Sequence, residues 1–147
     1  DIAGQNKSWD KALLYYKKAK QLQPTAAEYY YKYGGALGMK AKSVNKFKAL
    51  GMIDEIKSSF EKAVALDPKH KESRWALLML YLELPGIIGG SETKAVAYSN
   101  ELMRLSPLEG YLSKGYIDEY FGRNKKAEIN YLKALEINNS KIAFQKL

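Results

Sequence analysis

One spacing recurs four times along this chain and limits what it can fold into. In each copy the marked residues are four, three and five positions apart. Intervals of three and four place side chains on one face of an α-helix, and a proline that follows cannot continue that helix. The spacing therefore predicts four amphipathic helices with defined ends. The copies are Ala12, Tyr16, Ala19, Pro24; Ile56, Phe60, Ala63, Pro68; Ala95, Ser99, Leu102, Pro107; and Ala127, Tyr131, Ala134, Asn139.

A further helix is predicted before each of the last three copies. The segments Ala26–Gly38, Lys71–Leu84 and Gly110–Gly122 each carry an apolar or aromatic stripe. The chain thus predicts a unit of helix, turn, helix and proline, used repeatedly. Only six residues precede Lys7, too few for a first helix in the first copy. We therefore expect this chain to lack residues that precede it in the natural protein.

The pattern resembles the tetratricopeptide repeat family, whose units combine an aromatic and glycine on the first helix with small, aromatic and small positions on the second. In the second repeat Tyr30, Tyr33, Gly34 and Leu37 stand at the first-helix positions. The resemblance covers essentially the whole chain. It implies an all-α fold, a right-handed α-solenoid of antiparallel helix pairs with about seven helices. We expect one domain, residues 1–147, with a partial repeat at 7–24, repeats at about 26–68, 70–107 and 108–139, and a C-terminal segment at 140–147.

The repeats differ in length from the family unit of about 34 residues. The closing positions 24, 68, 107 and 139 are 44, 39 and 32 residues apart. In the second repeat, apolar residues recur every three or four residues from Phe47 to Phe60. We expect its second helix to begin early, near Ser43, and to run to Leu66 with lysines on its solvent side. The third repeat has Leu78 where the family prefers glycine and Ser99 where it prefers an aromatic residue.

The segment LPGIIGGS, residues 84–91, accounts for the extra length of the third repeat. We expect Pro85 to end one helix, Ser91 to cap the next, and Ile87 and Ile88 to tuck against the helix pair. A phosphate-binding P-loop would need a lysine directly after its glycines, and Gly90 is followed by serine instead. We therefore interpret the segment as a bend. It resembles an insertion in bacterial tetratricopeptide proteins that often carry signal peptides, which slightly favours a periplasmic or secreted location over a cytoplasmic one.

The family resemblance implies that the first helices line a concave groove for a peptide. Tyr31 and Gly35 take the places where some members have a lysine-and-asparagine clamp for a terminal carboxylate, so we do not expect that clamp. The register of the fourth repeat is ambiguous by two residues. The groove positions carried over are Glu28, Tyr31, Gly35, Glu72, Trp75, Met79, Leu82, Tyr111, Lys114 and Asp118.

The sequence offers little evidence for a catalytic site. There are no cysteines, and His70 is the single histidine, which we expect to be a solvated turn residue. Adjacent carboxylates such as Asp118 and Glu119 diverge on a helix rather than converge as an acid–base pair would. We predict no enzymatic activity, no cofactor and no metal site. No apolar stretch approaches the ~20 residues that a membrane span needs.

We predict a non-enzymatic scaffold that binds a protein or an extended peptide. One alternative is self-assembly, through the face left by the incomplete first repeat or through the C-terminal residues 140–147. Another is an acidic or anionic partner, nucleic acid or a membrane surface, bound by a basic patch in a chain of net charge +8. Nucleic acid is disfavoured because only three of 24 basic residues are arginine. The basic patch consists of Lys40, Lys42, Lys46 and Lys48.

Overall fold

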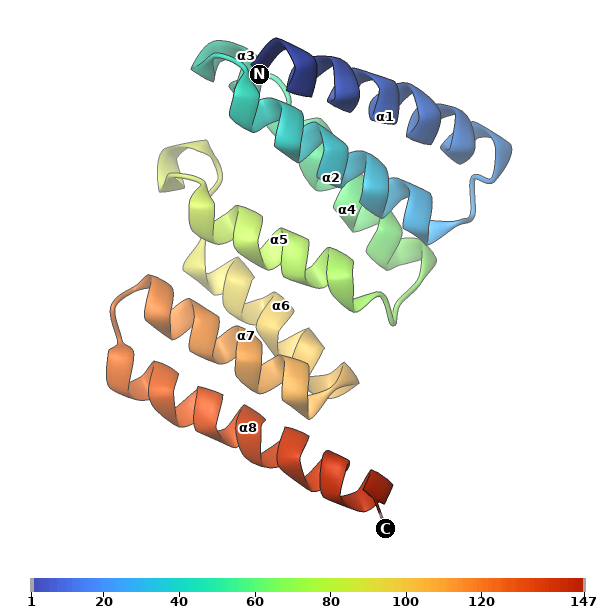
Figure 1. The fold of residues 1–147 in the computed structure, drawn as a ribbon. Helices are drawn as coiled ribbons and strands as arrows, with labels where there is room; N and C mark the ends of the chain where they lie inside the picture. The colour runs from blue at the N-terminus through green and yellow to red at the C-terminus, as the bar shows by residue number, and fades with distance from the viewer. Residues whose placement is uncertain (1, 147) are drawn as a thin grey trace. The chain divides into compact units, whose positions relative to one another are not determined.

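The computed structural model is all-α over the residues that it describes, which are the backbone of residues 2–146 and the side chains of residues 7–141 (Figure 1). The predicted all-α fold is confirmed, and residues 2–146 form seven long helices and one short helix, α3. The chain divides into two compact units, residues 1–76 and 77–147, with the division inside α5. The elements are α1 (Ile2–Leu22), α2 (Ala27–Ser43), α3 (Lys46–Leu50), α4 (Ile53–Leu66), α5 (Lys71–Glu83), the 3-10 turn η1 (Gly86–Ile88), α6 (Glu92–Leu105), α7 (Pro107–Tyr120) and α8 (Asn124–Lys146).

The first unit is held together by α2, which packs against both α1 and α4. Its close approach to α4 depends on Gly34, where a Cβ atom would lie only 2.9 Å from the Phe60 ring. Ile56, Phe60 and Ala63 of α4 are all buried. The small, aromatic and small positions read from the sequence therefore form the α2–α4 interface.

The second unit repeats this arrangement in α7 and α8, which also pack side by side (Figure 1). A Cβ atom on Gly115 would lie 2.5 Å from Cε1 of Tyr131. Ala127 and Ala134, on either side of Tyr131 in α8, are buried. Gly115 and Tyr131 are thus the counterparts of Gly34 and Phe60, which resolves the ambiguous register of the fourth repeat.

The third repeat differs from the second and fourth in the sizes of two buried side chains. Leu78 on α5 and Ser99 on α6, which replace the usual glycine and aromatic residue, are both buried. The first-helix residue is thus larger, and the second-helix residue smaller, than at the corresponding positions of the other repeats. The Ser99 hydroxyl also lies 2.7 Å from the hydroxyl of Ser113, so a buried hydrogen bond links α6 to α7.

The prediction of one long helix from near Ser43 to Leu66 is wrong. α2 continues to Ser43, the chain is extended at Val44, and a separate short helix, α3, follows before α4 begins at Ile53. The Asn45 side chain accepts a 2.9 Å hydrogen bond from the Lys48 N–H and so caps the start of α3. Gly51, which has low helix propensity, stands at its end. A cap and a glycine therefore interrupt an apolar periodicity that by itself indicated one helix.

The ends of α7 and α8 also differ from expectation. Pro107 closes the third repeat but is the first residue of α7, where its missing N–H costs nothing and Ser106 serves as the cap. α8 passes through Asn139 and continues to Lys146. Asparagine keeps its backbone N–H and does not stop a helix as proline does. The side chains of residues 142–147 lie outside those that the structure describes.

The segment 84–91 is a bend that is built by backbone hydrogen bonds. The Pro85 carbonyl accepts from the N–H groups of Ile88 and Gly90, both at 3.0 Å. A Cβ atom on Gly90 would lie 1.8 Å from the Leu84 carbonyl oxygen, so this position requires glycine. The predicted Ser91 cap is confirmed by its bond to the Lys94 N–H. The expected tucking of the isoleucines is wrong, because the turn leaves Ile87 94% exposed and Ile88 37% exposed.

Candidate peptide-binding surfaces

The first unit brings five of the predicted groove residues onto α2 and the first turns of α5. Tyr31 is half-buried, with its ring centroid 6.0 Å from that of Phe60 and 5.2 Å from that of His70. Beside it, no atom lies within 4 Å of a Cβ built on Gly35. A fixed aromatic ring therefore stands next to an open strip of backbone. We call Glu28, Tyr31, Gly35, Glu72 and Trp75 the α2–α5 surface.

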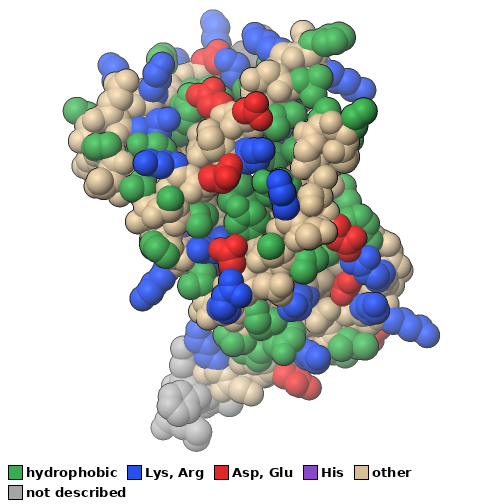
Figure 2. Space-filling model, turned by 180° about the vertical axis from the view of Figure 1, so that it is seen from behind, with side chains coloured by type: hydrophobic (Ala, Val, Ile, Leu, Met, Phe, Trp, Pro, Cys, Tyr) green, Lys and Arg blue, Asp and Glu red, His purple; other side chains and the backbone are tan. Residues whose placement is uncertain are grey.

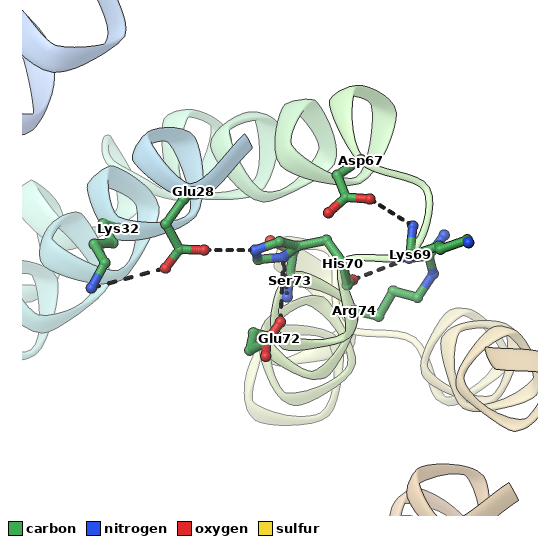
Figure 3. Close-up of polar contacts among 8 residues, drawn as sticks. All are labelled: Glu28, Lys32, Asp67, Lys69, His70, Glu72, Ser73 and Arg74. Atoms are coloured by element: carbon green, nitrogen blue, oxygen red, sulfur yellow. Dashed lines mark hydrogen bonds and ion pairs between the residues drawn. The ribbon is translucent and has the colours of Figure 1, made fainter. Parts of the chain in front are cut away.

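His70 organises the polar side of this surface, and its expected role as a solvated residue is wrong. The side chain is only 7% exposed. Its Nδ1 accepts the Ser73 N–H at 3.2 Å, which caps α5, so Nε2 carries the ring proton and donates it to Glu28 Oε2 at 3.0 Å. Figure 3 shows Glu28 reaching the imidazole from α2, with Glu72 approaching from the start of α5. Sequence reasoning missed this role because Glu28 is 42 residues from His70.

The carboxylates of this surface remain available to a partner. Glu28 is also 3.9 Å from Lys32 Nζ, and Glu72 Oε2 is 3.8 Å from His70 Nδ1. Both side chains are more than half exposed. Trp75 is half-buried, one turn after Glu72 on the same face of α5. The α2–α5 surface therefore combines two aromatic rings with two exposed carboxylates.

In the second unit, two predicted groove residues on α5 differ in access. Met79 is 36% exposed, whereas Leu82 is 5% exposed and belongs to the core. The prediction that Leu82 lines a groove is therefore wrong. An apolar residue is expected at this position whether it packs in the core or lines a groove, so the sequence alone could not distinguish these two roles.

The residues predicted on α7 are used to hold helices together. Lys114 Nζ donates to Asn100 Oδ1 of α6 at 3.2 Å, and Lys133 Nζ of α8 lies 5.4 Å from the Tyr111 ring centroid. Asp118 accepts from Arg123 Nε at 2.8 Å and from Asn130 Nδ2 at 3.0 Å.

Arg123 extends this network from Asp118 to α6. Its NH2 group lies 2.6 Å from Glu92 Oε1. The hydrogen bonds to Asp118 and Glu92 raise the pKa of the Arg123 guanidinium. The carboxylate of Asp118 therefore takes part in the contact between α7 and α8.

The register set by Gly115 assigns other residues of α7 to the groove positions. Counting from Gly34 to Glu28, Tyr31 and Gly35, the same offsets from Gly115 reach Glu109, Leu112 and Tyr116. Leu112 and Tyr116 are half-buried. Burial raises the pKa of the Tyr116 phenol, with a further rise from the nearby Glu83 carboxylate. These residues were missed because the expected register placed the groove two residues later, at Tyr111, Lys114 and Asp118, and only packing shows that Gly115 meets Tyr131.

The predicted basic patch is divided between two elements. Lys40 on α2 bonds to Asp10 of α1 at 2.5 Å. Lys42, at the end of α2, and Lys46 and Lys48, on α3, are exposed. These three lysines form no ion pair with a carboxylate whose side chain the structure describes.

Within the described residues, no cluster of three histidine, cysteine or acidic side chains could hold a metal ion. No helix among them is long and apolar enough to cross a membrane.

Comparison with known families decides what the paired helices are. The family model described as tetratricopeptide repeat matches residues 47–70 and 108–141. These two stretches of the chain are similar to tetratricopeptide repeats. The matched stretches contain α4 with Phe60 and α7–α8 with Gly115 and Tyr131. Residues 70–107, the repeat with Leu78 and Ser99 in exchanged sizes, lie almost wholly outside them.

Two solved structures are similar to this chain. One, described as the crystal structure of MamA, is 20% identical with a TM-score of 0.47, covering 97% of this chain and 98% of that chain. Another, the crystal structure of MamA protein, is 20% identical with a TM-score of 0.48, covering 94% and 87%. No curated protein sequence matches the chain. Tetratricopeptide repeats generally mediate protein–protein interactions.

Proposed function

We propose that this protein is a non-enzymatic scaffold that binds a protein or an extended peptide on the first helices of its repeats. The observation that carries this proposal is the α2–α5 surface, where Tyr31 is held between Phe60 and His70 beside the open backbone of Gly35. A side chain that is already fixed loses little conformational entropy on binding. Tyrosine and tryptophan are enriched among residues that dominate binding energy.

The charge at these positions favours a partner with basic side chains. Glu28, Glu72 and Glu109 occupy equivalent places in the first turns of α2, α5 and α7. Carboxylates near a helix N-terminus also favour the helix itself. However, Glu28 and Glu72 are additionally exposed beside aromatic rings. We therefore expect bound peptides to combine a lysine or arginine with an apolar or aromatic residue.

Selection from a phage-displayed random peptide library tests the proposal. Peptides that bind the wild-type chain are synthesised, and their affinities are measured by fluorescence anisotropy. We expect Tyr31→Ala/Trp75→Ala to weaken binding by about thirtyfold, the loss of one binding hot spot or more. Gly35→Phe should also weaken binding, because its side chain would fill the open strip. The matched control is Tyr15→Ala/Tyr120→Ala, which removes two exposed tyrosines elsewhere.

Equal affinities for wild type and the Tyr31/Trp75 variant would contradict the proposal. Circular dichroism of each variant separates lost binding from lost folding. Self-association is the second candidate, because α8 exposes Ile129, Leu132 and Leu135 by about half of their surface. It predicts a mass that rises with concentration in light scattering and falls back to one chain in Leu132→Glu/Leu135→Glu.

A further inference from the structure

The short helix α3 carries two apolar side chains that do not pack into a core. Phe47 is 88% exposed and Leu50 is 45% exposed, and none of the five residues of α3 is buried. The two side chains are three positions apart and so share one face of the helix. Leaving a phenylalanine in water forgoes the free energy that its burial would give. α3 therefore presents an apolar face that the described part of this chain does not cover.

The same helix is surrounded by positive charge that is not neutralised. Lys46 and Lys48 flank Phe47 in the sequence, and Lys42 lies at the end of α2, just before α3. No acidic residue occurs between Glu28 and Asp54. Figure 2 shows lysine and hydrophobic side chains next to one another at the upper right, the corner where α3 lies. We call Lys42, Lys46, Phe47, Lys48 and Leu50 the α3 tip.

The chemistry of the α3 tip selects among possible partners. Lysine carries a compact, hydrated charge on a flexible stem, which suits a diffuse anionic layer better than the bidentate contacts for which arginine is used. The Phe47 side chain, 88% exposed, protrudes from the surface and is free to enter an apolar layer. Aromatic side chains insert readily at the boundary between lipid headgroups and acyl chains.

We propose that the α3 tip docks the protein onto a membrane of anionic phospholipids. Lys42, Lys46 and Lys48 attract the negative headgroup layer, while Phe47 and Leu50 enter the apolar boundary beneath it. This function is separate from peptide binding on the α2–α5 surface. It would hold the scaffold at a membrane while the groove engages a partner.

Flotation with lipid vesicles tests the docking directly. The wild-type chain is mixed with phosphatidylcholine vesicles that contain either no phosphatidylglycerol or 40 mol% of it. We expect binding only to the anionic vesicles, falling steeply as salt screens the charges. Each lysine near an anionic surface contributes roughly fivefold in affinity, so Lys42→Glu/Lys46→Glu/Lys48→Glu should lower binding by about a hundredfold or more. Phe47→Ala should lower it by about tenfold.

Matched controls separate an effect of the α3 tip from effects of net charge or of any other exposed apolar side chain. Lys62→Glu/Lys125→Glu/Lys126→Glu makes the same change in net charge at exposed lysines of α4 and α8. Ile87→Ala removes an isoleucine that is 94% exposed. Both should leave most of the binding intact. Tyr31→Ala/Trp75→Ala should bind vesicles as wild type does, so that loss of the groove and loss of the α3 tip are distinguishable.

A label reports insertion independently of affinity. Because the chain has no cysteines, Leu50→Cys accepts a single environment-sensitive fluorophore, and Ile87→Cys provides the control site. We expect a blue shift at position 50 with anionic vesicles and none at position 87. Equal loss in the two lysine variants, or no effect of Phe47→Ala, would overturn the proposal. So would binding to soluble polyglutamate or DNA, but not to vesicles, that depends on the same lysines.

Discussion

Tyr33 joins three helices of the first unit through one side chain. Its hydroxyl donates to Glu55 Oε1 of α4 at 2.7 Å, and Lys20 Nζ of α1 lies 3.7 Å from its ring centroid. Burial, and then the hydrogen bond to Glu55, raise the pKa of Tyr33 from 10.0 to about 12. Burial also lowers the pKa of Lys20. The neutral phenol is therefore the form that this packing accommodates.

This shift predicts a loss of stability at alkaline pH. Because the folded-state pKa of Tyr33 is raised, its stabilising contribution is complete below pH 10 and is lost as pH rises through about 12. The unfolding free energy of wild type should fall relative to that of Tyr33→Phe over this window, since the variant has no phenol to ionise. Denaturant unfolding of both proteins at several pH values measures the difference. A difference that stays constant from pH 9 to pH 12 would contradict the shift.

His70 shows what sequence reasoning can and cannot reach for a single residue. Its place in the turn after Pro68 was predictable from the repeat spacing. Its burial was not, because this depends on Glu28 and Tyr31, which are far away in sequence. A histidine between two lysines reads as solvated until its acidic and aromatic neighbours are known. The residue that orders the α2–α5 surface was therefore absent from the predicted groove.

At the scale of the helices, two adjacent glycines of α2 have opposite roles. A Cβ on Gly34 would meet the Phe60 ring at 2.9 Å, whereas one on Gly35 would have no atom within 4 Å. Alanine in a helix interior is more stable than glycine by about 0.5–1 kcal/mol. Gly35→Ala should therefore stabilise the protein by about that amount.

Gly34→Ala has the same change in helix propensity but should destabilise the protein by about 1–3 kcal/mol through overpacking against Phe60. Chemical denaturation of the two variants isolates the contact, since only the packing differs. Equal stability would show that the Phe60 ring moves aside at no cost. A second variant, Gly34→Ala/Phe60→Leu, should recover part of the loss.

Element type was predictable from this sequence, and element boundaries less so. The four spaced copies fall on α1, α4, α6 and α8, because offsets of three and four bury one helical face whatever surrounds it. The break between α2 and α4 was missed because Phe47 and Leu50 continue the apolar spacing although they are exposed. Periodicity reports which residues could share a face. It does not report whether anything packs against that face.

At the scale of the whole molecule, the repeat spacing predicted the fold more accurately than it predicted which residues form the candidate surface. Glu28, Tyr31 and Gly35 were placed correctly on α2 because Gly34 fixes the register of the second repeat. Lys114 and Asp118 were assigned by a register that only the Gly115–Tyr131 contact corrects. Family positions therefore transfer to a chain only as far as its packing register is known.

The division into two units also predicts which helices a destabilising substitution affects. A Cβ on Gly110 would lie 2.5 Å from the Cα of Met103, so Gly110→Ala would force the backbones of α6 and α7 apart. Stability in helical repeats is roughly a sum of repeat and neighbour terms, and local opening follows local packing. Hydrogen exchange of Gly110→Ala should rise most in residues 77–146 and far less in α1, α2 and α4. The same variant should keep its peptide contacts at Tyr31. A uniform rise across all helices would instead mean that the units unfold as one, and that the division of the chain carries no energetic boundary.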